Sequence, residues 1–180
     1  MRKVLIILFL ALNTILSATN YYVKNGGNDA ASGTSDATAW ANHPWMSTWK
    51  GNTKLVAGDN VFMKRGDSWN IAAPSAPYMT VSQSGRAGSY ITTTAYGTGN
   101  KPIIHISTNS AYPIIYGIGE SFIVFDNLEI KHWSSSMDPG WYYCILFGHV
   151  GSKISHDWII TNCDIHNCPN PQLFDSSRKI

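Results

Sequence analysis

The sequence has few charged residues and no strong excess of either sign. Charged side chains make up 13% of the 180 residues, and 13 basic residues stand against 11 acidic ones. A chain that binds nucleic acid usually carries a concentrated basic surface, so a nucleic-acid partner is not expected. The motifs of phosphate loops, nucleophile elbows, HExxH zinc sites, paired CxxC clusters and N-glycosylation are also missing. These absences disfavour nucleotide-binding, serine-hydrolase and zinc enzymes.

The sequence also lacks a hydrophobic run long enough to span a membrane. Its longest apolar run, residues 4–12, falls well short of the ~20 residues that a bilayer requires. Arg2 and Lys3 precede this run and the small residue Ala18 follows it, a pattern typical of a secretory signal peptide. We therefore expect cleavage after Ala18 and a secreted or extracellular protein, in the periplasm or on the cell surface as alternatives. Its mature chain would carry 11 basic and 11 acidic residues and no membrane attachment.

Cysteine is scarce, and three cysteines cannot all pair within one chain. Cys163 falls at an apolar position of a predicted strand, which favours a small buried side chain. Cys144 and Cys168 could form a disulfide in an oxidising compartment, although their spacing does not establish it. A zinc site of Cys163, His166 and Cys168 is disfavoured, because only three ligands are visible and their spacing fits no standard finger.

The clearest positive signal is an internal repeat. Residues 122–130, FIVFDNLEI, return as WIITNCDI in residues 158–165, with Asn127 matching Asn162 at an offset of 35 residues. Each copy has a short apolar run before the Asn and an apolar–acid–apolar alternation after it, which suits a strand with one buried face. Asn tolerates left-handed backbone geometry and suits a corner between two strands. Such a repeat predicts a solenoid of stacked strands.

Other segments extend this pattern along the chain. The expected strands are residues 21–23, 90–95, 102–106, 113–116, 122–126, 128–131, 143–147 and 157–165, the last broken at Asn162.

The N-terminal part carries an aromatic segment instead of a clear repeat. Pro44 can begin a short helix in which Trp45 and Trp49 have helical spacing, and this helix would cover the open end of the solenoid. We therefore divide the chain into a signal peptide (1–18), an N-terminal cap with a first irregular coil (19–88) and incomplete β-helix coils (89–180). Because no closing element follows the last predicted strand, the sequence predicts a truncated solenoid whose coils continue beyond Ile180.

The repeat and the opening motifs together carry a family resemblance. Tyr21-Tyr22-Val23, Gly-Asn-Asp and Gly-Thr-Ser turns, a Trp, and Arg-Gly-Asp-x-Trp resemble the N-terminal part of secreted right-handed parallel β-helix proteins of the pectate-lyase-like superfamily. The resemblance runs from about residue 21 to residue 168. It implies an all-β, right-handed parallel β-helix in which Asn127 and Asn162 are rungs of an Asn ladder.

The resemblance also implies a function. A carbohydrate-active protein that acts on or binds polysaccharide, as a lyase or a glycoside hydrolase, is expected; a non-catalytic extracellular binding or structural solenoid is the alternative. In such enzymes one sheet carries the catalytic groups, and its candidate strands here, residues 114–116 and 145–147, contain no acid, Lys or Arg. No catalytic residue is therefore assigned, and the active coils are expected beyond Ile180.

Two sets of candidate binding residues remain. Glu129 and Asp164 should point outward from adjacent strands about 4.8 Å apart, where they would share a calcium ion or form a solvated edge. Trp133, Asp138 and Trp141 lie on the longest predicted loop, where they would bind sugar or pack the loop onto the solenoid. Calcium is the one cofactor that these residues suggest.

Overall fold

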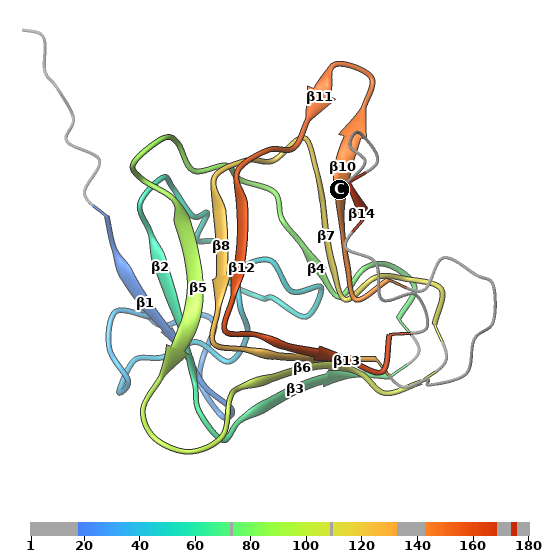
Figure 1. Cartoon of the computed structure of the whole chain (residues 1–180). Coiled ribbons are helices and arrows are strands. Elements are labelled where there is room, and N and C mark those ends of the chain that lie inside the picture. Colours follow the sequence, from blue (N-terminus) through green and yellow to red (C-terminus); the bar gives the residue numbers. More distant parts are fainter. Residues whose placement is uncertain (1–17, 73, 109, 133–142, 169–173, 176–180) are drawn as a thin grey trace, which may run out of the picture.

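The structure, a computed structural model, describes residues 18–72, 74–108, 110–132, 143–168 and 174–175 (Figure 1). Within these ranges every regular element is a β-strand and no helix occurs, so none is present that could cross a membrane. The strands are β1 (Asn20–Val23), β2 (Asn60–Lys64), β3 (Ser68–Ile71), β4 (Met79–Thr80), β5 (Ile91–Tyr96), β6 (Ile103–Ile106), β7 (Ile115–Ile118), β8 (Ile123–Asp126), β9 (Glu129–Lys131), β10 (Ile145–Val150), β11 (Lys153–Ile154), β12 (Trp158–Thr161), β13 (Asp164–His166) and β14 (Phe174–Asp175).

The strands form three sheets that the chain visits in turn. The first sheet has the order β1-β2-β5-β8-β12, the second β13-β9-β6-β3, and the third β11-β10-β7-β4 with β14 beside β10. From β2 onward, successive strands enter the first, second and third sheets, and Figure 1 shows these sheets as separate walls. Named strands pair in parallel except β10 with β11. This all-β arrangement is consistent with a parallel β-helix or solenoid.

The register between coils confirms the 35-residue repeat. Phe125 in β8 pairs with Ile160 in β12, and Ile130 in β9 pairs with Ile165 in β13. Asn127 and Asn162 separate these strand pairs and have φ angles of 61° and 49°. Most L-residues avoid this left-handed region, whereas Asn enters it readily. Both asparagines therefore turn the chain from the first sheet into the second.

The core lies inside the three walls, because alternate residues of each strand point inward. Ile91, Ile123 and Phe125 fill it from the first sheet, Ile104 and Ile130 from the second, and Ile115 from the third; all are buried. The last described coil is less well covered. Ile165 pairs with the buried Ile130 but remains 36% exposed.

The predicted N-terminal helix over residues 44–49 is wrong. Met46 instead forms an antiparallel bridge with Met79 of β4, and Ser47 N–H donates to the Tyr78 carbonyl. Thr80 N–H donates to the Trp45 carbonyl, so backbone groups that a helix would pair internally are used by the neighbouring chain. Trp45 and Met46 are nevertheless buried in the core. The segment covers apolar surface through turns.

The open question about cysteine pairing has an answer in the structure. Cys144 and Cys168 form a disulfide, whereas Cys163 is free and half-buried. Burial raises the pKa of the Cys163 thiol above its ordinary value. Cys163 is therefore a packing residue, and the disulfide joins the residue before β10 to the segment that follows β13.

Candidate functional site

Ionisable side chains gather on the outer side of the second sheet. Strand register places Glu129 beside Asp164, and it places Lys131 between His105 and His166. These positions alternate with buried residues such as Ile130, so their side chains point away from the core. We call this surface the polar face, and its residues are Lys101, His105, Glu129, Lys131, Asp164 and His166.

Glu129 is the centre of the polar face. Its Oε1 lies 3.3 Å from Lys131 Nζ and 3.1 Å from His166 Nε2. The Glu129 side chain is 22% exposed and the His166 side chain 44% exposed, so solvent or a ligand can reach both. Glu129 therefore shares one carboxylate oxygen between the Lys131 ammonium group and the His166 imidazole.

Asp164 has a different partner. Its Oδ1 lies 2.9 Å from Lys101 Nζ, although its backbone pairs with Glu129 as the repeat predicted. Each carboxylate therefore has a cation of its own. In the described part of the chain, no group of three or more His, Cys, Asp or Glu side chains is arranged to hold a metal ion. Calcium binding by Glu129 and Asp164 stays a prediction.

His105 supplies the polar face with a neutral imidazole. Burial is the main cause that lowers its pKa below the ordinary value, and the charge of Lys131 acts in the same direction. The Glu129 carboxylate opposes this shift. The lowered pKa favours the unprotonated form of the His105 ring.

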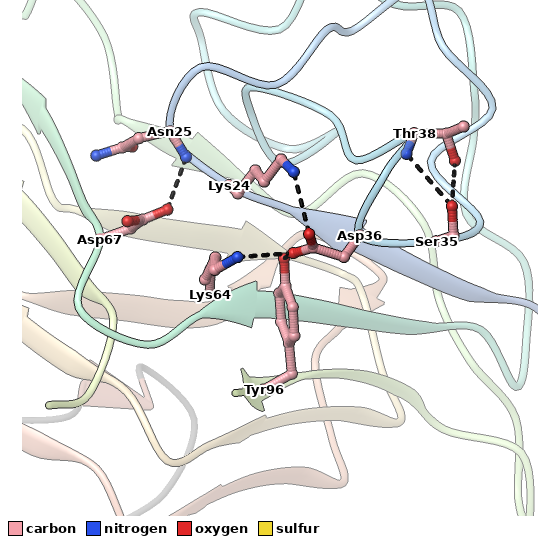
Figure 2. A network of polar contacts seen from close by, with 8 residues as sticks. All are labelled: Lys24, Asn25, Ser35, Asp36, Thr38, Lys64, Asp67 and Tyr96. Atoms are coloured by element: carbon pink, nitrogen blue, oxygen red, sulfur yellow. Dashed lines mark hydrogen bonds and ion pairs between the residues drawn. The ribbon is translucent and has the colours of Figure 1, made fainter. Parts of the chain in front are cut away.

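A second ionic cluster lies beside the first sheet (Figure 2). Asp36 accepts a hydrogen bond of 2.7 Å from the Tyr96 hydroxyl and contacts Lys64 at 2.9 Å and Lys24 at 3.1 Å. The Tyr96 hydroxyl first, and then the two ammonium groups, hold the pKa of Asp36 well below its usual range. A carboxylate that stays ionised is a poor proton donor. This cluster ties the loop that contains Asp36 to β2 and β5.

The corner asparagines are held by charged neighbours. Arg65 donates to Asn127 Oδ1 at 2.7 Å, and Asn162 Nδ2 donates to Asp126 Oδ1 at 2.9 Å. The role of Asn127 and Asn162 as ladder rungs that fix the register stays a prediction.

Three predicted sugar-binding residues, Trp133, Asp138 and Trp141, lie outside the described residues, and their role stays a prediction. Sequence reasoning missed Lys101, His105, Lys131 and His166 as partners of the two acids. Strand alternation already placed His105 and Lys131 on outward positions, so their direction could have been inferred. Their lateral pairing depends on inter-coil register, which appears only in the structure.

A comparison with protein-family models and with curated protein sequences finds no match. The fold is similar to that of a GH136 lacto-N-biosidase from Eubacterium ramulus, in its native form (TM-score 0.61) and as a selenomethionine derivative (TM-score 0.60). For both, identity is 18% over 84% of this chain and 27% of that chain. A rhamnogalacturonan lyase is similar with a TM-score of 0.54 and 18% identity, over 88% of this chain and 43% of that chain. The chain thus spans less than half the length of each, and the likeness concerns the fold.

Proposed function

We propose that the chain is part of a secreted, carbohydrate-active protein that acts on polysaccharide as a lyase or a glycoside hydrolase. Its scaffold would be a right-handed parallel β-helix of the pectate-lyase-like type. The similarity in fold to a lacto-N-biosidase and a rhamnogalacturonan lyase supports this class of function. The signal-like residues 1–18 and the Cys144–Cys168 disulfide support export to an oxidising compartment.

The observation that supports the polar face as the site is that Glu129 Oε1 contacts both Lys131 and His166 on an exposed sheet surface. Glycoside hydrolases move protons with carboxyl groups, and lyases remove a proton with a general base. On the polar face Glu129 exchanges a proton with the saccharide, and His166 orients its carboxyl group. His105, whose pKa is lowered by burial, accepts a proton.

The test is to incubate the purified secreted chain with a panel of neutral and acidic polysaccharides. Formation of new reducing ends reports cleavage of either kind, and ultraviolet absorbance of unsaturated uronate reports a lyase alone. We expect cleavage of at least one polysaccharide. Absence of both signals with every member of the panel would contradict a catalytic role.

A non-catalytic binding solenoid is the second candidate. It is favoured by the ion pairs themselves, because Glu129 and Asp164 each have a cationic partner within 3.3 Å. Such pairing stabilises the ionised form of a carboxylate and so disfavours its use as an acid. Retention of the chain on an immobilised polysaccharide without any cleavage would support this alternative.

A further inference from the structure

The N-terminal part of the structure contains a hollow of about 290 Å³ between residues 44–54 and residues 82–83. This volume is close to the lower end of the ~300–1,000 Å³ range of small-molecule sites. No residue of the polar face lines it. The residues that matter for the argument are Trp49, Asn52, Thr53, Lys54, Ser82 and Gln83.

Trp49 gives the hollow an aromatic wall with a defined position. Its ring contacts the buried Trp40 edge to face, with centroids 5.0 Å apart. A Cβ on Gly51 would collide with the Trp49 ring, so the glycine allows this packing. The Asp29 carboxylate accepts hydrogen bonds from Lys50 N–H and from Asn42, and thereby braces both sides of the segment. Trp49 therefore packs on the core and lines the hollow from a braced segment.

The lining of the hollow also includes an amide whose orientation is fixed by hydrogen bonds. Gln83 Oε1 accepts a hydrogen bond from Trp45 Nε1 at 2.8 Å, and Gln83 Nε2 donates to Ser82 Oγ at 2.7 Å. Asn52 and Thr53 add a second amide and a hydroxyl to the lining. A lining that combines an aromatic residue with amides and hydroxyls matches a sugar ring, which has apolar C–H faces and polar edges.

The charge of the residues that line the hollow limits the class of ligand that it would bind. Lys54 is exposed, and among the residues that the structure describes it is the one charged side chain that lines the hollow. Other lysines, such as Lys24, Lys64, Lys101 and Lys131, lie within ion-pair distance of an acid, whereas no ion pair involves Lys54 in the part of the chain that the structure describes. An unpaired ammonium beside a sugar-sized hollow favours an anionic ligand.

We propose that this hollow is a binding site for one residue of an acidic saccharide, with the sugar ring on Trp49 and its carboxylate facing Lys54. It shares with the proposed function only the class of ligand, and it is separate from the polar face. One uronate residue of an acidic polysaccharide would bind in this hollow, while another part of the same polysaccharide would bind elsewhere on the protein.

The test is calorimetric titration of the full chain with trimers of galacturonate, glucuronate and mannuronate, and with their uncharged methyl esters. We expect at least one acid trimer to bind more tightly than its ester, with an affinity that falls as salt is added. Lys54→Met should weaken binding of that acid about threefold to fivefold and leave the ester unchanged. Lys50→Gln removes an exposed charge on the same segment that does not line the hollow, and it should have no effect.

Trp49→Ala should weaken binding of both acid and ester roughly tenfold. Since Trp49 also packs on Trp40, Trp49→Phe serves as the variant that keeps an aromatic side chain, and it should retain most of the affinity. Equal affinity for acid and ester, equal effects of Lys54→Met and Lys50→Gln, or no binding of any acid trimer would overturn the proposal. The comparison of Lys54→Met with Lys50→Gln reports on the hollow, whereas the cleavage rate of Glu129→Gln reports on the polar face, so failure of the hollow and failure of the polar face are separate results.

Discussion

Asp36 and Glu129 are carboxylates with two basic neighbours each, but the kinds of neighbour differ. Asp36 contacts two lysines and the Tyr96 hydroxyl, whose pKa is raised by burial and by Asp36 itself. Glu129 contacts one lysine and His166. The Asp36 side chain is 48% exposed and the Glu129 side chain 22%. The pKa of Asp36 is held below its usual range, so this carboxylate ties the loop in its ionised form, whereas Glu129 has an imidazole among its partners.

The two carboxylates also join different parts of the fold, because their partners come from different strands. The partners of Asp36 come from β2, β5 and the residue after β1, and they join the N-terminal loop to the first sheet. Those of Glu129 come from β9 and β13, which form the polar face. The Asp36 cluster therefore attaches a loop to the first sheet, whereas Glu129 belongs to the face for which we propose proton transfer.

The largest expected effect separates the two carboxylates by activity. Glu129→Gln keeps the size of the side chain and removes its acid–base function, so cleavage of a polysaccharide substrate should fall by about 10²-fold or more. Asp36→Asn should leave the cleavage rate within about twofold, because Asp36 does not belong to the polar face. Initial rates at equal protein concentration provide the measurement. Equal losses in the two variants would remove the distinction.

The next effect concerns the corner that joins the two sheets. Asn127→Leu places a branched side chain at a φ of 61° and removes the acceptor of Arg65, so the free energy of unfolding should fall by about 1–2 kcal/mol or more. Asn127→Gly tolerates the backbone angle, and it should lose less stability. Denaturant titration of both variants separates backbone strain from the lost hydrogen bond. Unchanged stability of Asn127→Leu and Asn162→Leu would contradict the ladder role of these asparagines.

The buried His43 makes the stability of the protein depend on pH. His43 is fully buried, its Nδ1 accepts from Trp45 N–H, and its Nε2 lies 3.0 Å from Thr93 Oγ1. Burial lowers the pKa of His43 to about 3 from 6.5. The unfolded chain therefore binds the proton first as the pH falls. Stability from His43 is complete above pH 6.5 and decreases between 6.5 and 3 by up to about 1.4 kcal/mol per pH unit.

Replacing His43 should remove this part of the acid sensitivity. The difference in unfolding free energy between pH 7 and pH 4 should be smaller in His43→Asn than in the original chain. His156→Asn changes an exposed histidine and serves as the control. The same slope in all three proteins would show that His43 does not titrate as described.

The smallest effect is on the Asp36 tie itself. Its pKa is held below the usual range, so its contribution to stability is complete above the unfolded pKa of 3.8 and is lost as the pH falls from there toward the lowered folded value. Asp36→Asn should lower the melting temperature slightly at pH 7, and this difference should shrink below pH 3.8. Because the side chain is exposed, added salt should also reduce it. A melting difference that is independent of both pH and salt would argue against an electrostatic tie.

Much of the strand pattern could be predicted from the sequence because it depends on local alternation. Residues 102–106 and 122–126 were expected as strands, and the structure has Ile103–Ile106 and Ile123–Asp126. The prediction of a helix over residues 44–49 was wrong because backbone groups of this segment pair with β4 and with the carbonyl of Tyr78, the residue before β4. Side-chain spacing in the sequence does not reveal such a tertiary contact.

The partners of Glu129 were harder to predict because coils differ in length. Lys131 lies 26 residues after His105 but 35 residues before His166, although all three occupy neighbouring positions in the second sheet. A search at one repeat length therefore finds His166 and misses His105. The Cys144–Cys168 pairing likewise required the fold, because 24 residues separate the two cysteines.

The most direct test of a saccharide site on the polar face is a histidine-selective NMR titration of the full chain with oligosaccharides from the polysaccharide panel. The imidazole resonances of His105 and His166 should shift with at least one saccharide, and those of the buried His43 should stay in place. Glu129→Gln should weaken the shift of His166. Shifts confined to histidines outside the polar face, or none with any saccharide, would contradict the account.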